Sequence, residues 1–329
     1  AAVAMQDKLP GFQPTPQPLP GARNTATPAA VPLAELKGHM GAVGTVSFTD
    51  DGRSIVTTGD DRTLRIWSST TGGLSRTIAL GESPPTSMAL LGTRALTGHE
   101  NGRVLLWDLD RGDKPSVYKR NEADVWSATF AGEPGRFAVA THDWKVALWD
   151  AGTTTAPLHV FDGHESAVQA VAFSRHRRLL ASGSADRTVK LWNLETLDLE
   201  RTYRGHPDFV TALAFSPDGK TLASASLDGS IRLWSTASSR LQRKLTGHKG
   251  RVGSLAFSPA GDTLASAGDD GAVRIWDQKR GRTSRTFIGH AGAVKAVAFA
   301  PDGKSVAAAG DDGVVRIWPS APLIPRRGN

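Results

Sequence analysis

The feature that most constrains this chain is a motif that recurs every 42 residues in its C-terminal half. Each copy begins with a Gly-His pair and ends with a tryptophan 29 residues after that glycine. A fixed period of this length is typical of an array of equal structural units. The four regular copies begin at Gly163, Gly205, Gly247 and Gly289 and end at Trp192, Trp234, Trp276 and Trp318.

Three more copies precede these four, which gives seven units in all. Residues 38–67 form a clear copy, whereas residues 81–107 and 120–149 form two degenerate copies. The degenerate copies lack the Gly-His pair and have Glu82 and Asn121 at the histidine position. The sequence therefore predicts five regular units and two irregular ones.

Short alternating segments within each unit predict β-strands. In the unit that begins at Gly163, these segments are residues 168–173, 179–182 and 189–192, with turn residues between them. A further alternating segment, here residues 199–203, precedes the next Gly-His pair. Alternation of β-branched and aromatic residues, interrupted by Pro-Asp-Gly or Asp-Gly, indicates strands joined by hairpins. We therefore predict an all-β chain of radial blades, each with four antiparallel strands.

This pattern resembles the WD-repeat β-propeller family over residues 33–318. In six of the seven units an aspartate lies six residues before the final tryptophan, and the second unit has Asn101 there. The Trp-Asp dipeptide itself occurs three times, for example at Trp107-Asp108. The resemblance implies a seven-bladed β-propeller of four-stranded antiparallel blades.

The two ends of the repeat array predict how the ring closes. The last unit has only three strands before Trp318 ends it, so its fourth strand has to come from elsewhere. Residues 33–37 precede the first Gly-His pair and match the strand position of residues 241–245. We expect this N-terminal strand to complete the last blade, because closure protects sheet edges from pairing with other molecules. The chain then divides into a Pro/Ala-rich extended arm or linker at 1–32, a propeller at 33–319 and a short C-terminal tail at 320–329.

The resemblance also implies a buried hydrogen-bonded set in each regular blade, made of the loop histidine, a strand Ser or Thr, the turn aspartate and the final tryptophan. The seventh unit has Ala308 at the hydroxyl position, so we expect an incomplete set there. The two units without the histidine should be less rigid, because a partly satisfied buried polar network stabilises less. The predicted sets are His39, Thr57, Asp61 and Trp67; His164, Ser182, Asp186 and Trp192; His206, Ser224, Asp228 and Trp234; and His248, Ser266, Asp270 and Trp276.

Recurring Ser, His and Asp residues raise the hypothesis of a catalytic triad. Nucleophilic catalysis needs one exposed nucleophile beside an oriented base, whereas this combination repeats at the same blade position. Gly219-Lys220-Thr221 resembles the end of a phosphate-binding loop, but Ala214 stands where the first glycine of that loop belongs. The chain has no cysteine, no Gly-x-Ser-x-Gly elbow and no His-Glu-x-x-His pair. We therefore predict no catalytic residue, no cofactor and no metal site.

Charge raises the question of partners. A net charge of +7 and a pI near 9.9 suggest nucleic acid, but the densest basic cluster, residues 175–178, occupies a single turn. Phosphate binding favours a continuous basic stripe with stacking aromatics, so we favour a protein partner over nucleic acid. No apolar run approaches the roughly 18 residues of a membrane span, and we expect no direct membrane insertion.

The resemblance places partner contacts on one face, the top face. This face carries the loop before the first strand and the turn between the second and third strands of each blade. Acidic residues outnumber basic ones there, so the face should attract a cationic segment of a partner. The alternative is that these acidic residues are only solvated and bind no partner. Trp126 follows a first-strand valine, where the equivalent residues of the other units are small, polar or charged. We expect it to contact the partner, and the alternative is that it packs inside an irregular blade. The predicted partner-binding residues are Trp126, Phe209, Asp60, Glu100, Asp124, His142, Arg251, Asp269, Lys295 and Asp311.

These features predict a non-catalytic protein–protein interaction scaffold, a subunit or domain of a larger assembly, whose partner presents a basic segment or one recognised by aromatics. Two alternatives stay open: a regulatory or sensor domain of a larger multidomain enzyme, and a propeller that binds a small ligand or a cation. The chain begins at Ala1. Small residues there are typical of a mature end after signal-peptide cleavage, but also of a trimmed chain or a domain of a longer protein. The compartment is therefore left open between cytoplasmic and periplasmic or exported.

Overall fold

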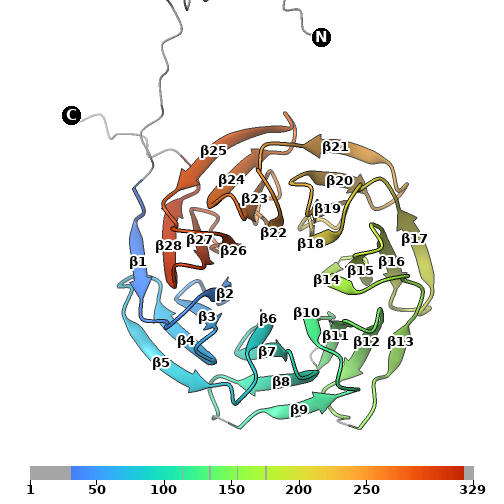
Figure 1. The fold of residues 1–329 in the computed structure, drawn as a ribbon, viewed down its shortest axis with the longest axis horizontal. Helices are drawn as coiled ribbons and strands as arrows, with labels where there is room; N and C mark the ends of the chain where they lie inside the picture. The colour runs from blue at the N-terminus through green and yellow to red at the C-terminus, as the bar shows by residue number, and fades with distance from the viewer. Residues whose placement is uncertain (1–30, 113, 133–134, 154, 175, 322–329) are drawn as a thin grey trace, which may run out of the picture.

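Twenty-eight β-strands and no helix make up the described part of the chain. The computed structural model describes residues 31–321, apart from 113, 133–134, 154 and 175. Seven four-stranded sheets stand as blades around a central channel (Figure 1). Each sheet is antiparallel, so the predicted seven-bladed propeller is confirmed. No helix in the described ranges could cross a membrane.

The blades follow the sequence units in order, with the innermost strand first. Blade one holds β2 (Val43–Phe48), β3 (Ser54–Gly59), β4 (Thr63–Ser68) and β5 (Leu74–Ala79); blade two holds β6 (Pro85–Leu91), β7 (Arg94–His99), β8 (Arg103–Asp108) and β9 (Ser116–Lys119); blade three holds β10 (Val125–Phe130), β11 (Arg136–Thr141), β12 (Val146–Asp150) and β13 (His159–Phe161). Blade four holds β14 (Val168–Ser174), β15 (Leu179–Ser184), β16 (Val189–Asn193) and β17 (Leu199–Tyr203); blade five holds β18 (Val210–Phe215), β19 (Thr221–Ser226), β20 (Ile231–Ser235) and β21 (Leu241–Leu245). Blade six holds β22 (Val252–Phe257), β23 (Thr263–Gly268), β24 (Ala272–Asp277) and β25 (Arg282–Ile288); blade seven holds β26 (Val294–Phe299), β27 (Ser305–Gly310), β28 (Val314–Pro319) and β1 (Ala34–Lys37).

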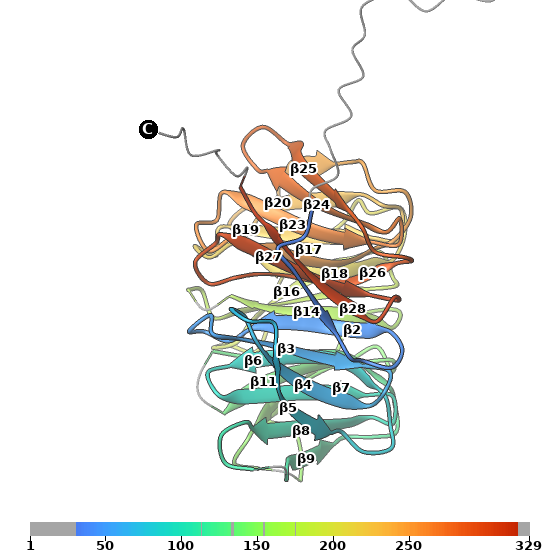
Figure 2. The ribbon, with the colours of Figure 1, turned by 90° about the vertical axis from the view of Figure 1, so that its left-hand side faces the viewer.

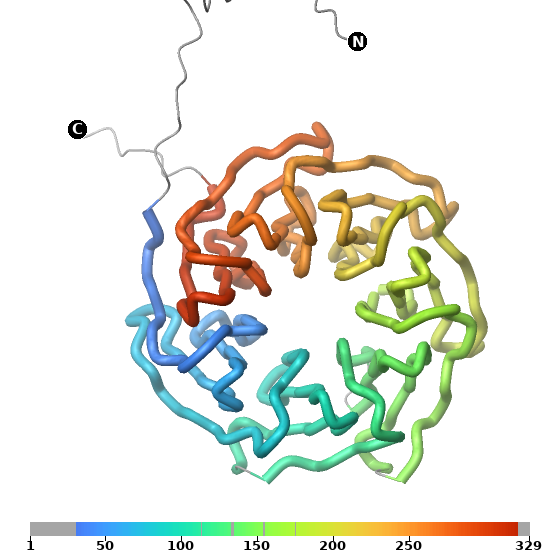
Figure 3. Tube along the Cα trace, in the orientation of Figure 1, coloured from blue at the N-terminus to red at the C-terminus, as the bar shows by residue number. Residues whose placement is uncertain are grey.

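Ring closure depends on β1, the outermost strand of blade seven. This strand pairs antiparallel with β28, with Leu36 opposite Val315, and lies alongside it in Figures 2 and 3. The Leu36 side chain is 1% exposed and packs in a core cluster with Val315 and Ile317. Glu35 on the same strand pairs with Arg316 at 2.9 Å. The predicted N-terminal strand is therefore confirmed, and it joins the first-described residues to the last blade.

The hydrophobic core lies between neighbouring blades. Each of the seven buried clusters in the described residues draws side chains from two adjacent blades. The cluster between blades four and five, for example, joins Leu191 of β16 to Trp234 of β20. Because each blade buries its faces against its two neighbours, closure of the ring leaves no terminal blade with an uncovered face.

Some predictions concern residues outside the described part of the structure. These are residues 1–30 of the predicted arm, residues 322–329 of the predicted tail and Arg175 of the basic cluster. Within the described part of that cluster, Arg178 pairs with Glu195 at 3.1 Å.

Candidate functional site

A β-bulge on the innermost strand of every blade shapes the mouth of the channel. In blade three, Val125 pairs with Thr141 and Ser127 pairs with Ala140, so Trp126 between them has no partner on β11. Such an extra residue bends its strand and re-aims its side chain. All seven unpaired residues line one central cavity of about 860 Å³. We call them the bulge ring: Gly44, Thr86, Trp126, Gln169, Thr211, Gly253 and Lys295.

One member of the bulge ring differs from the sequence-based assignment. Counting along the repeat gives Ser87 as the blade-two equivalent of Trp126, but Ser87 pairs with Gly98 and Thr86 is the unpaired residue. Blade two has Pro85 where the other blades have valine, so the sequence lacks the residue from which the position is counted.

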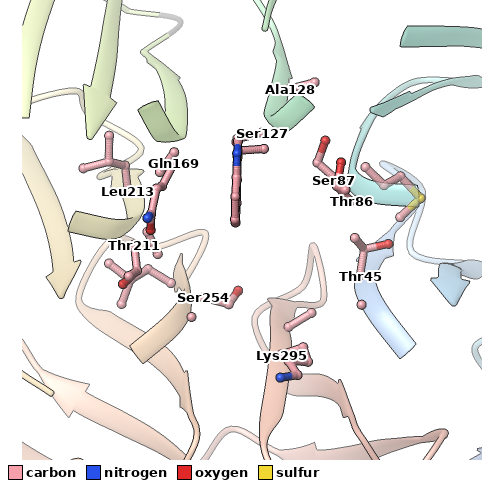
Figure 4. A pocket seen from close by; sticks show the side chains of 18 of the residues that line it. Thr45, Thr86, Ser87, Ser127, Ala128, Gln169, Thr211, Leu213, Ser254 and Lys295 are labelled. Atoms are coloured by element: carbon pink, nitrogen blue, oxygen red, sulfur yellow. The ribbon is translucent and has the colours of Figure 1, made fainter. Parts of the chain in front are cut away.

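Hydroxyl groups tie the bulge ring to its neighbours. The Thr86 hydroxyl donates to the carbonyl of Val125 at 2.5 Å, and the Thr211 hydroxyl donates to the carbonyl of Val252 at 2.6 Å. Both bonds cross from one blade to the next, so the channel wall is held by inter-blade hydrogen bonds at these two positions. Figure 4 shows side chains that surround the cavity: Thr45, Ser87, Gln169, Thr211, Ser254 and Lys295.

The cavity receives seven of the ten residues predicted to bind a partner. Phe209, Asp124 and His142 are not part of its lining. Trp126 is 40% exposed, and its ring stacks on that of His142 with 6.3 Å between centroids. Trp126 therefore does not pack inside its blade. The lining residues from the prediction are Trp126, Asp60, Glu100, Arg251, Asp269, Lys295 and Asp311.

Backbone hydrogen bonds hold the two top-face segments of a blade together. In blade three the amide of His142 donates to the carbonyl of Asp124 at 2.9 Å, and in blade five the amide of Leu227 donates to the carbonyl of Phe209 at 3.0 Å. The residue before each turn aspartate is thus fixed beside the start of the first strand. This geometry brings the loop before the first strand and the turn between the second and third strands to the same mouth.

One exposed residue of this face was missed from the sequence. Trp144, in the turn between β11 and β12, is 51% exposed and has a φ of 73°. Glycine holds this turn position in four of the other blades, and Arg62 and Arg187 hold it in the remaining two. A bulky residue with positive φ is unusual, and local strain of this kind costs about 1–3 kcal/mol. The loss of the expected turn glycine was the sequence signal.

The hydrogen-bonded set of blade four has the geometry of a catalytic triad, but its hydroxyl has no access to solvent. His164 Nδ1 lies 2.7 Å from Asp186, and Nε2 lies 2.8 Å from the Ser182 hydroxyl, which accepts from Trp192 Nε1 at 2.8 Å. A carboxylate only accepts, so Nδ1 carries the hydrogen and Nε2 accepts from Ser182. Ser182 is 0% exposed, so no substrate can reach it and the set holds the blade together. The sets of blades one and six are alike.

Blade five departs from the predicted set. In the described structure no hydrogen bond joins Asp228 to His206; Asp228 accepts from Ser230 instead. Arg232 Nη1 lies 2.8 Å from His206 Nδ1, and because a guanidinium only donates, Nδ1 must accept. The hydrogen is therefore on Nε2, which donates to Ser224 at 2.6 Å. Burial, together with the charge of Arg232, lowers the pKa of His206 to about 4.

The lowered pKa predicts that acid destabilises the protein. An unfolded histidine titrates near 6.5, so this contribution of His206 is complete above that pH and is lost as the pH falls to about 4. The full loss for this one group is on the order of 3 kcal/mol. Urea unfolding at several pH values between 7 and 4 should show this decline. The variant His206→Gln should show a smaller decline over the same range, and an unchanged decline would contradict the assignment.

A second acid step should follow at lower pH. Although burial raises the pKa of Asp61, hydrogen bonds from Thr63 and His39 lower it to about 2. Hydrogen bonds from His290 and Arg316 likewise outweigh burial and lower the pKa of Asp312 to about 2. The stability from these carboxylates is present above pH 3.8 and is lost as the pH falls to about 2.

Blade two corrects the expectation that it lacks a histidine. His99, at the end of β7, lies with Nε2 2.9 Å from the Thr97 hydroxyl, and Trp107 Nε1 donates to the same hydroxyl at 3.1 Å. The other ring nitrogen of His99 donates to the carbonyl of Ser83 at 2.9 Å. A histidine from the strand thus replaces the loop histidine, which the Gly-His spacing could not reveal.

Blades three and seven have altered sets. In blade three Asn121 Nδ2 donates to Asp143 at 2.7 Å, and Arg120 also pairs with that carboxylate. In blade seven His290 Nδ1 lies 3.0 Å from Asp312, but Nε2 is buried without a hydrogen-bond partner beside Ala308. The described residues contain no group of three or more metal-ligating side chains.

Comparison with known families gives five matches to the WD domain, G-beta repeat. They cover residues 30–68, 155–193, 197–235, 239–277 and 281–319, which together make up more than half of the chain. The chain belongs to the WD-repeat family. The matched repeats are blade one and blades four to seven, so the two units that lack the Gly-His pair fall outside them.

Curated relatives of this WD-repeat protein match it over about half its length. It is 32% identical over 167 residues to the ribosome biogenesis protein WDR12 homolog of Ixodes scapularis, across 49% of this chain and 39% of that protein. It is 27% identical over 185 residues to target of rapamycin complex subunit wat1 of Schizosaccharomyces pombe, across 53% and 59%. It is 26% identical over 157 residues to apoptotic protease-activating factor 1 of Rattus norvegicus, across 48% and 12%. Each match spans less than two thirds of the relative.

Proposed function

We propose that this WD-repeat propeller is a non-catalytic scaffold that binds a partner protein at the mouth of its central cavity. The observation that carries the proposal is Trp126, which is the single aromatic member of the bulge ring and is 40% exposed. An exposed tryptophan at the centre of a concave surface is typical of residues that dominate protein–protein binding energy. The relatives support the proposal, since one is a complex subunit by name and another is a ribosome biogenesis protein.

Burial of the hydroxyl groups in the four predicted hydrogen-bonded sets supports the proposal that the protein is not catalytic. The hydroxyls of Thr57, Ser182, Ser224 and Ser266 belong to residues that are 0% exposed. A nucleophile has to meet its substrate, so these groups act as internal links between strands. The open cavity offers alanine, serine and threonine side chains and charged residues at its rim.

Affinity capture with the full chain tests this function. Proteins that the unaltered chain captures from the source cell should be depleted about tenfold or more with Trp126→Ala, because loss of a central aromatic contact costs about 2 kcal/mol or more. Leu241→Ala on the outer strand β21 is the matched control, since Leu241 is 43% exposed but far from the cavity lining. Equal capture by all three proteins, each shown to be folded by circular dichroism, would overturn the proposed site.

A regulatory domain of a larger enzyme is the second candidate. It is favoured by the match to apoptotic protease-activating factor 1, in which the matched segment covers only 12% of the relative. The coding sequence on both sides of the chain tests this candidate. An in-frame catalytic domain would support it, and stop and start signals at the chain's ends would exclude it.

A further inference from the structure

We propose that the partner segment is an extended peptide of mixed chemistry, with a large apolar side chain over blades three to five and a cationic side chain over blades six, seven, one and two. This inference rests on the proposed function of the same cavity mouth. It adds the chemical class of the partner and its orientation across the ring.

Ring closure places the charged residues of the cavity lining in one arc. All six charged residues that line the cavity belong to blades six, seven, one and two, whereas the lining from blades three to five is uncharged. In the sequence the acidic members lie near both ends of the repeat array. They become neighbours because β1 completes blade seven beside blade one. The acidic arc consists of Asp269, Asp311, Asp60 and Glu100.

The acidic arc keeps an excess of negative charge. Its four carboxylates are exposed, and two cations, Arg251 and Lys295, share the lining. Lys295 pairs with Asp311 at 3.4 Å. Asp60, Asp269 and Glu100 make no ion pair or side-chain hydrogen bond with the described residues, so their charges are available to a ligand. Exposed acids around a concave mouth attract a cationic group and increase its association rate.

The opposite arc has an uncharged cavity lining and three exposed large apolar side chains. Trp126 is 40% exposed, and Phe209 and Leu227 on blade five are 41% and 38% exposed. The backbone hydrogen bond from Leu227 to Phe209 places these two residues side by side. Between blades three and five, blade four contributes Gln169 to the lining without a charge. A large apolar side chain of the peptide would cover this apolar surface on both flanks of blade four, and removal of apolar surface from water is favourable.

The two arcs together favour a peptide over other ligands. A nucleic-acid backbone would bring phosphates to the carboxylates of the acidic arc, which like-charge repulsion opposes. Asp124, Glu165 and Asp208 on the entry loops of blades three to five add further negative charge to the top face. A simple cation would leave the apolar arc exposed. An extended segment with both kinds of side chain satisfies both arcs at once.

Selection from a random dodecapeptide phage library tests the inference with the full chain. Peptides that depend on the mouth are those that bind the unaltered protein and lose binding with Trp126→Ala. We expect them to combine Lys or Arg with an aromatic or large aliphatic residue. A selected peptide is then synthesised, and its affinity is measured by fluorescence anisotropy for each variant at low and high salt.

Neutralisation of the acidic arc should weaken binding in a salt-dependent way. The double variant Asp60→Asn/Asp269→Asn should bind the peptide about tenfold more weakly at 50 mM salt, and the difference should shrink at 500 mM because salt screens exposed charges. The matched control Asp110→Asn/Asp198→Asn makes the same charge change in exposed loops between third and fourth strands, on the opposite face. The control should leave the affinity unchanged.

Removal of apolar surface should act independently of salt. Phe209→Ser/Leu227→Ser should weaken binding about tenfold at both salt concentrations, while Leu199→Ser/Leu241→Ser on exposed outer strands should not. Mouth-dependent peptides without a cationic residue, or an unchanged affinity in either arc variant, would overturn this inference and leave the proposed function standing. Failure to select any mouth-dependent peptide would count against the proposed function itself.

Discussion

Leu36→Asp is expected to lower the free energy of unfolding by more than about 4 kcal/mol, because it buries an unpaired charge at the ring closure. Leu36 is 1% exposed and packs with Val315 and Ile317 across the junction of the two chain ends. Loss of β1 would expose the edge of β28 and one face of blade seven. No other described strand pairs with the outer edge of β28, so nothing in the described residues takes the place of β1. Urea unfolding followed by circular dichroism measures the effect.

Leu33→Asp is the matched control for this prediction. Leu33 also lies beside blade seven, because its amide donates to the carbonyl of Ile317 at 2.6 Å, but its side chain is 57% exposed. The same substitution there should cost less than about 0.5 kcal/mol, as is usual for surface positions. Equal stability of the Leu36 and Leu33 variants would show that β1 does not hold the ring closed.

Ser182→Ala is expected to lower the free energy of unfolding by about 3 kcal/mol. The change leaves His164 Nε2 and Trp192 Nε1 buried without their shared hydroxyl partner, and each unsatisfied group costs about 1–3 kcal/mol. The reciprocal change, Ala308→Ser in blade seven, should raise the free energy of unfolding by about 1 kcal/mol. It supplies the hydroxyl that His290 Nε2 lacks.

Ala307→Ser is the control for the reciprocal change. Ala307 and Ala308 are adjacent and both 0% exposed, so they point to opposite faces of blade seven: Ala307 packs in the cluster that contains Leu36, and Ala308 packs in the cluster that contains Trp318. Only Ala308 stands at the position that holds Ser182 in blade four. A hydroxyl there has no partner in the described core, so this variant should lose stability where Ala308→Ser gains it. Thermal and urea unfolding of the three variants measure whether each substitution raises or lowers the free energy of unfolding. Loss of stability in Ala308→Ser would contradict the role assigned to the set.

Repeat spacing predicted the blades because each unit carries its own strand and turn signals. The position of residues 33–37 relative to the first Gly-His pair was enough to predict β1, since the last unit lacked a fourth strand. The hydrogen-bonded sets of blades one, four and six follow the predicted residues in geometry. Blade five does not, because Arg232 donates to His206 Nδ1 in place of the expected aspartate contact. Blade two, for which no set was predicted, uses His99 from strand β7.

The site was harder to predict than the fold. Trp126 stood out in the sequence because the equivalent residues in other units are not aromatic. The bulge that turns its side chain into the channel depends on pairing between β10 and β11, and Thr86 showed that counting from a motif can miss by one residue. Trp144 follows the turn aspartate Asp143, at a position where the other units have Gly or Arg, so the recurring motif does not predict a large exposed side chain there.

Local patterns repeated at a fixed period were enough to predict the repeat number, the strand order and the strand that closes the ring. Which side chains meet at the channel depends instead on how the blades pack. Acids from residues 60, 100, 269 and 311 form one arc because closure places blade seven beside blade one. Such contacts join residues far apart in the chain, and no local pattern encodes them. A blade buries its faces only against its neighbours, so the closed ring sets what each mouth residue faces.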